Sequence, residues 1–169
     1  MAIDESYLTR AEIWVFTTTL VYFLMNGAQI FETAVIVPKW SASPPESLLM
    51  FRGKYALDFK WFWIVFHSIH EITFILAIIF CWKLVEIRTW LLILFAVHFG
   101  VRAWTLAYFA PNIIRFQRLA NKSGELANLI SRTKMWRLWN YVRVGVFIAV
   151  SLGLIPICIK LLRINPDRI

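Results

Sequence analysis

The sequence predicts an all-α integral membrane protein, a four-helix bundle with short amphipathic helices in the loops on one side. The 169 residues are 60% hydrophobic and only 17% charged, with a mean hydropathy of +0.65. A soluble domain has about a quarter of its residues charged. Four apolar windows reach the length of about 20 residues that a membrane-spanning helix needs. Most of the nine tryptophans lie near the ends of these windows, where aromatic rings favour the headgroup level.

The four windows form a single predicted domain that covers residues 1–169. They are the apolar stretches at about residues 12–37, 61–83, 89–110 and 142–162. Four spans place both termini and the turn at 83–88 on one side of the membrane, here called the terminal side. The connections 38–60 and 111–141 then lie on the other side, here called the loop side.

The basic residues predict an orientation and exclude one class of partner. More Lys and Arg lie on the loop side than on the terminal side, so the positive-inside rule favours a cytoplasmic loop side. The net charge is +8, and the basic residues that cause it cluster beside the ends of the predicted spans. Anionic lipid headgroups are the simplest partners for basic residues in these positions. Because no basic soluble domain is present, we expect the lipid bilayer as a partner and no nucleic acid.

The two loop-side connections are expected to be partly helical. Residues 38–60 predict a structured loop with a short helix that begins at Pro45, where Glu46 suits the positive end of the helix dipole. Residues 112–135 predict two amphipathic pieces with a break near Gly124. The sequence leaves open whether these pieces lie on the membrane surface, extend the third and fourth spans, or form a hairpin in water.

Each span carries polar residues, and these fall in the half nearer the loop side. They are Tyr22, Asn26, Gln29, Glu32 and Thr33; His67, His70 and Glu71; His98 and Arg102; and Asn140 and Arg143. An ionisable group in hydrocarbon costs about 2.5–3.5 kcal/mol on the most lenient scale, so it needs a partner. His67, His70 and Glu71 share one helical face, and so do His98 and Arg102. We therefore favour one shared pocket, open to the loop side, over separate local roles for each residue.

Three motifs outside the histidine segment resemble a known family. They are NGAQIFETAVIVPKW in the first span, APNIIRF after the third and WRLWNYVR before the fourth. These are similar to motifs of the anthrone oxygenase-like family, four-helix membrane proteins that are mostly bacterial. The matching positions are Gly27, Pro38, Trp40, Pro111, Asn112, Trp136, Asn140 and Arg143. The histidines of the FHSIHE motif lie outside the family pattern.

The resemblance implies an oxygenase of a bacterial inner membrane that acts on a flat phenolic substrate. It would turn an activated methylene into a carbonyl with O2 and without an organic cofactor. A histidine or glutamate would take the proton and an arginine would stabilise the phenolate. The candidate catalytic residues are His67, His70, Glu71, His98, Arg102 and Arg143. The candidate substrate contacts are Asn26, Gln29, Trp104, Tyr108 and Asn140, although ordinary helix packing also accounts for the two aromatic residues.

The same residues form a candidate ligand set for a metal. Imidazole and carboxylate groups suit Fe, Cu or Zn. The candidate ligands are Glu32, His67, His70, Glu71 and His98. The carboxylates are too few for a di-iron bundle, which favours a mononuclear site. A haem b between His70 and His98 is a weaker alternative, and a site without any cofactor stays open.

The sequence thus favours a membrane oxidoreductase or oxygenase with a small hydrophobic substrate, phenolic or quinone-like. Two non-enzymatic classes stay open. A protein that only binds a quinone, a haem or another small molecule would need the same pocket. A small transporter would use the polar residues as a path, although these stop halfway across the bundle. A homo-oligomer is compatible with the sequence, which identifies neither the substrate nor the oligomeric state.

Overall fold

The computed structural model describes residues 4–119 and 126–164, and within these ranges every regular element is a helix. The elements are α1 (Glu5–Phe31), η1 (Glu32–Ile36), α2 (Val37–Trp40), η2 (Glu46–Phe51), α3 (Lys60–Phe80), α4 (Val85–Trp104), η3 (Thr105–Phe109), α5 (Ala110–Leu119) and α6 (Leu126–Ile164). Segments η1 and η3 are π-helical, and η2 is a 3-10 helix. The predicted all-α fold is confirmed.

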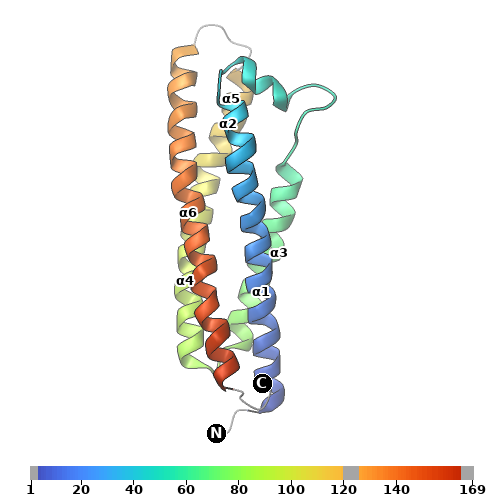
Figure 1. Cartoon of the computed structure of the whole chain (residues 1–169), viewed down its shortest axis with the longest axis vertical. Coiled ribbons are helices and arrows are strands. Elements are labelled where there is room, and N and C mark those ends of the chain that lie inside the picture. The colour runs from blue at the N-terminus through green and yellow to red at the C-terminus, as the bar shows by residue number, and fades with distance from the viewer. Residues whose placement is uncertain (1–3, 120–125, 165–169) are drawn as a thin grey trace.

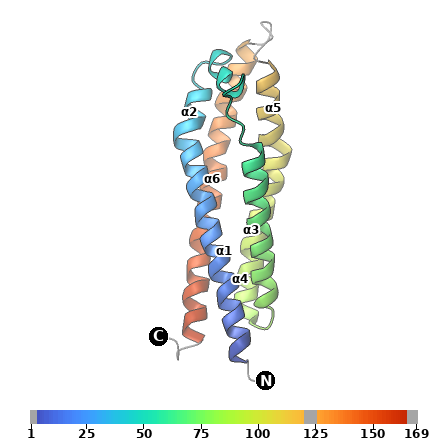
Figure 2. The same ribbon diagram turned by 90° about the vertical axis from the view of Figure 1, so that its right-hand side faces the viewer.

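The helices form an elongated bundle with both ends of the described chain at the terminal side (Figures 1 and 2). Helix α1 continues through η1 into α2, and α4 continues through η3 into α5. Helix α1 packs against α3 and α6, and α4 packs against α6. In the described ranges four helical segments are long and apolar enough to cross a membrane: Glu5–Trp40, Lys60–Phe80, Val85–Phe116 and Asn128–Ile164. The chain is a multi-pass membrane protein.

Three of these segments are longer than the spans expected from hydropathy. Asn128–Ile164 has 37 residues, a length of about 55 Å at 1.5 Å per residue. The hydrocarbon core of a bilayer is only about 30 Å thick. On the loop side, α5 and the first turns of α6 therefore extend the third and fourth spans, one of the three options that the sequence leaves open. The break expected near Gly124 lies outside the described residues.

Two prolines account for the π-helical segments. Segment η1 ends two residues before Pro38, and η3 ends two residues before Pro111. Proline has no N–H to donate, and its ring clashes with the carbonyl four residues earlier. The residue before each proline instead donates its N–H to the carbonyl five residues back, as Val37 does to Glu32. The wider π-turn lets the helix continue past the proline.

The loop-side end of the bundle has a hydrophobic core of its own, here called the aromatic cap. Its buried members are Val37, Trp40, Leu48, Phe109, Phe116, Leu129 and Trp136. The rings of Trp40 and Trp136 meet nearly at right angles with centroids 5.0 Å apart. The Trp136 indole N–H donates to the Phe109 carbonyl over 3.2 Å. The cap ties α2, η3 and α6 together beyond the polar part of the spans.

The aromatic cap corrects the role expected for two tryptophans. The sequence suggests that Trp40 and Trp136 lie at the headgroup level, yet their side chains are only 1% and 5% exposed. They are core residues, because the helices that carry them run on and pack against one another. Trp61 and Trp82, at 67% and 57% exposed, are free to serve as interfacial anchors. The loop-side helix at 46–51, by contrast, begins after Pro45 as predicted.

Candidate functional site

A layer of polar side chains lies between the aromatic cap and the long hydrophobic core of the terminal half. This polar layer consists of Tyr22, Asn26, Gln29, Thr33, His67, His70, His98, Asn140 and Arg143. All four long helices contribute to it. Apart from Arg143, which is partly exposed, its members are buried. A face of polar residues on each helix accounts for the layer, because helices in lipid turn such faces inward.

Three histidines and a tyrosine form the centre of the layer, here called the histidine cluster. His67, His70 and His98 are 4%, 0% and 0% exposed. The rings of His70 and His98 meet edge to face, with centroids 4.3 Å apart. The His67 ring lies 6.1 Å from that of His70. Tyr22 joins them from α1: its hydroxyl is 3.1 Å from Nδ1 of His98, and its ring packs edge-on to His70 at 4.6 Å.

The polar layer holds buried polar atoms that no protein group satisfies. In the described residues these atoms are Asn26 Oδ1, Gln29 Oε1, His67 Nδ1, His70 Nδ1 and Nε2, His98 Nε2 and Arg143 Nε. Each unsatisfied polar group in a bilayer costs several kcal/mol, and buried polar groups in proteins are nearly always paired. Because all of these atoms belong to one layer, the layer is suited to hold a polar ligand.

An ion pair borders the histidine cluster on the side between α3 and α4. Arg102 Nε donates to Glu71 Oε1 over 3.0 Å. The two side chains are 18% and 37% exposed, so the pair forms the partly open edge of the site. Arg102 also acts electrostatically on all three histidines. The arginine is thus available to stabilise negative charge that develops beside them.

A second arginine approaches the cluster from α6. Arg143 donates to Asn140 Oδ1 over 2.7 Å, and its guanidinium lies 4.6 Å above the Phe109 ring of the aromatic cap. Glu32 is its carboxylate neighbour, and Arg143 acts electrostatically on His67 as well. The two arginines therefore flank the histidines from different helices.

Two of the expected substrate contacts make hydrogen bonds between helices. Asn140 Nδ2 donates to Thr33 Oγ1 over 2.9 Å. Asn26 Nδ2 donates to the Phe147 carbonyl over 3.1 Å and to the Ser151 hydroxyl. These contacts hold α1 and η1 against α6. Gln29 is 2% exposed with its Oε1 unpartnered.

The two aromatic candidates lie elsewhere. Trp104 and Tyr108 pack beside the aromatic cap, where both rings contact Phe109 with centroids 5.0 Å away. Trp104 also contacts Trp139 edge-on at 5.7 Å. Among the ring contacts of the described residues, neither Trp104 nor Tyr108 contacts a histidine. Ordinary packing, the alternative that the sequence leaves open, accounts for these contacts. Tyr22 takes the place beside the histidines, and its position in the stripe of the first span is the sequence signal for it.

The expected metal ligands are only partly brought together. The three histidines are neighbours, but Glu71 pairs with Arg102 and Glu32 lies beside Arg143. In the ranges that the structure describes, no group of three His, Cys, Asp or Glu side chains is arranged to hold a metal ion. The donors that fit a transition metal are the imidazole nitrogens without a partner.

The contact between His70 and His98 bears on the haem alternative. An imidazole nitrogen lies about 2 Å from a bound metal, so two axial rings would have centroids about 6 Å apart. The observed separation is 4.3 Å, with one ring edge against the other ring's face. A haem iron does not fit between these two rings in this arrangement.

Among the described residues, the aromatic cap lies over the polar layer where the sequence predicts an opening to the loop side. Arg143 lies directly against Phe109 of this cap. The partly exposed edge is the pair of Glu71 and Arg102, which lies between α3 and α4 within two segments that are long and apolar enough to cross a membrane. We therefore expect access to the histidines from the bilayer at this edge.

Separating Glu71 from Arg102 is expected to destabilise the bundle. Glu71→Gln leaves Arg102 in lipid without a counter-charge, at a cost of about 2–3 kcal/mol in unfolding free energy. Arg102→Gln should cost a similar amount. The double variant should lose clearly less than the sum, because neither charge is left alone. Denaturant titrations in mixed micelles measure all three, and additive losses would show that the two groups do not interact.

Comparisons with known proteins do not assign the chain to a family. No family model matches the sequence, and no curated protein and no solved structure matches it significantly.

Proposed function

We propose that this chain is a bacterial inner-membrane oxidoreductase that binds a small, flat phenol or quinone-like molecule at the histidine cluster. The observation that carries the proposal is His70, which is fully buried and has no hydrogen bond of ordinary geometry at either ring nitrogen. Buried imidazole nitrogens without partners are suited to exchange hydrogen bonds and protons with a ligand. The rings of Tyr22 and His98 beside His70 supply flat contacts for an aromatic molecule.

The proposed chemistry begins with a proton transfer. A neutral imidazole has one nitrogen with a free lone pair, so His70 can take a proton from an activated methylene or a phenol. The substrate becomes an anion, and Arg102 or Arg143 stabilises its charge. Reaction with O2 then turns the methylene into a carbonyl and releases one molecule of water. No electron donor is needed, because the substrate supplies all four electrons that O2 accepts.

Side chains must move for the substrate to enter, since the histidines are almost fully covered. The edge at Glu71 and Arg102 is partly exposed, and we take it as the place of entry. A flat hydrophobic molecule dissolved in the bilayer reaches this edge without crossing water. The substrate class and the route of access therefore agree.

Anthrone, which has a methylene between two aromatic rings, is a suitable probe. The purified protein in lipid nanodiscs should bind it saturably and consume one O2 for each carbonyl formed. O2 uptake and mass spectrometry of the product measure this. The proposal is wrong if the protein neither oxidises anthrone nor binds it or a short-chain quinone above the level of empty nanodiscs.

A metal-assisted form is the second candidate, favoured by the unpartnered nitrogens of all three histidines. Because no three such side chains in the described ranges are arranged to hold an ion, His67, His70 and His98 would have to shift to bind it. The ion would then act as a Lewis acid toward the substrate oxygen. Elemental mass spectrometry of protein purified without an affinity tag distinguishes the two forms. Near-stoichiometric Fe, Cu or Zn that is lost in His67→Ala and His98→Ala supports the metal. Full turnover by protein that contains no metal supports the histidine base.

A further inference from the structure

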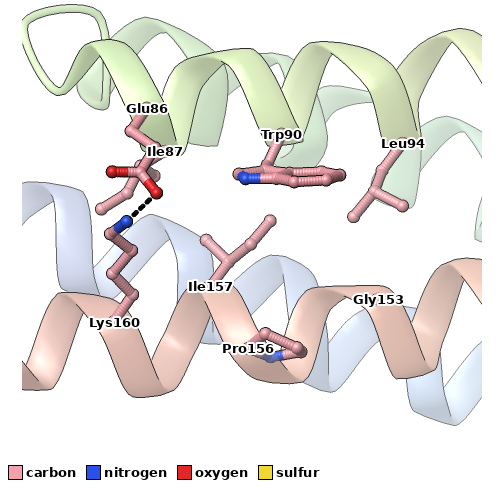
Figure 3. Close-up of a pocket in the computed structure, with 8 residues that line it drawn as sticks. All are labelled: Glu86, Ile87, Trp90, Leu94, Gly153, Pro156, Ile157 and Lys160. Carbon is pink, nitrogen blue, oxygen red and sulfur yellow. Dashed lines mark ion pairs between the residues drawn. The ribbon is translucent and has the colours of Figure 1, made fainter.

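A cavity lies on the terminal side of the histidine cluster, and its inner end at Leu94 is about one helical turn from His98. It is formed between α4 and α6 and has a volume of about 420 Å3 (Figure 3). This volume falls within the range of roughly 300–1,000 Å3 that ligand pockets have. Its walls are mainly apolar, and one charged residue from each helix stands at its end. The cavity is therefore an apolar groove with a charged end.

The apolar part runs along both helices. Trp90 and Leu94 of α4 face Ile157 and Pro156 of α6 across the groove (Figure 3). Leu94 is two turns from the start of the groove, about 12 Å along the helix axis. The groove thus descends from the membrane surface into the hydrocarbon, the course that a lipid acyl chain follows.

A glycine determines the shape of the inner end. Gly153 lines the groove opposite Leu94, and a Cβ at this position would come within 2.8 Å of Leu94 Cδ2. A larger residue here would have to push the Leu94 side chain aside. The available space next to Leu94 depends on the absence of a side chain at Gly153.

The polar end of the groove carries one acid and one base. Glu86 and Lys160 form an ion pair there (Figure 3). Their side chains are 65% and 39% exposed, so both charges are accessible. Glu86 is the second residue of α4, which places the pair at the membrane surface. The pair has no net charge, but it separates a negative from a positive group.

This charge pattern selects among lipid headgroups. An anionic headgroup is attracted by Lys160 but repelled by Glu86. A zwitterionic headgroup places its phosphate on Lys160 and its ammonium on Glu86, and so replaces one ion pair by two. A primary ammonium donates hydrogen bonds to the carboxylate, whereas a choline group has no N–H to donate. The pattern fits phosphatidylethanolamine best.

We propose that the groove between α4 and α6 binds one phosphatidylethanolamine molecule. Its ammonium pairs with Glu86, its phosphate pairs with Lys160, and an acyl chain lies against Trp90 and Leu94. This site does not depend on the function proposed for the histidine cluster, and the two can be tested separately.

Native mass spectrometry tests the site. Delipidated protein is given an equimolar mixture of ethanolamine, choline and glycerol phospholipids with identical chains. We expect one ethanolamine lipid to be retained with at least about fivefold preference over the others, as a charge-assisted hydrogen bond would give. Equal retention of the three lipids, or retention of none, would overturn the proposal.

Variants locate the site. Glu86→Gln should abolish the preference for ethanolamine over choline, and Lys160→Gln should lower retention of all phospholipids. Arg163→Gln removes an exposed base at the same end of α6 that does not line the groove, and it should change nothing. Gly153→Leu should lower retention by obstructing the groove. An undiminished ethanolamine preference in Glu86→Gln would place the lipid elsewhere, whatever the effect of Gly153→Leu on folding.

Discussion

Replacing His70 by alanine is expected to lower kcat/KM for oxidation of the probe by about 10²–10⁴-fold, the usual contribution of general acid–base catalysis. The expected loss follows from the position of the ring, which is fully buried with no hydrogen bond of ordinary geometry at either nitrogen. O2 uptake at several probe concentrations measures kcat and KM separately. The base role predicts that kcat falls more than KM rises.

Ser68→Ala is the matched control for this variant. Ser68 lies on the same helix, is exposed, and donates its hydroxyl hydrogen to the Ile64 carbonyl over 2.8 Å. Its removal should leave turnover unchanged. Imidazole added to the solution should restore part of the activity of His70→Ala, because the free ring can occupy the space of the missing one. A merely structural role of His70 would show no such rescue, and unchanged kcat in His70→Ala would exclude it as the base.

Trp136→Ala is expected to give the largest loss of stability, about 3–5 kcal/mol in the free energy of unfolding. The indole is 5% exposed, packs against Trp40 and Phe109, and donates its N–H to a backbone carbonyl. Alanine removes these contacts and leaves the Phe109 carbonyl without this donor. Denaturant titration followed by tryptophan fluorescence and circular dichroism gives the change.

Trp61→Ala serves as the comparison, since that indole is 67% exposed at the start of α3. It should cost well under half as much, because little packing is lost. Equal losses in the two variants would mean that the aromatic cap does not stabilise the protein, and that the loop-side ends of α2 and α6 contribute little to folding.

The fold class follows from hydropathy, whereas the lengths of the helices do not. An apolar window reports the part of a helix that lies in hydrocarbon, so the expected spans stop where charged residues such as Lys39 and Arg137 begin. The helices continue because Trp40 and Trp136 pack in the aromatic cap, a second core beyond the predicted spans. That core forms from three separate segments of the chain, and no single stretch of sequence signals it.

The sequence predicts which polar residues share a helix face in the candidate site. It predicts only some of the contacts that their side chains make. The i, i+3 spacing of His67 and His70 places both on one face, and helix depth brings His98 level with them. The spacing of residues does not predict which side chains pair with each other. Glu71 pairs with Arg102 because α3 and α4 bring the two side chains within reach, so this carboxylate is engaged by the arginine and not by a histidine. Side-chain pairing of this sort depends on rotation of the helices, and hydropathy does not report it.

The partly exposed edge at Glu71 and Arg102 also has a consequence for the concentration of substrate that the site encounters. A molecule that approaches through this edge comes out of the lipid phase, so its mole fraction in the bilayer sets the rate of encounter. Diluting the protein with additional lipid lowers that mole fraction even when the total amount of the molecule is constant. A compound's partition coefficient then contributes to apparent affinity as directly as its fit to the site. Water-soluble analogues with the right shape would be poor ligands for this reason alone.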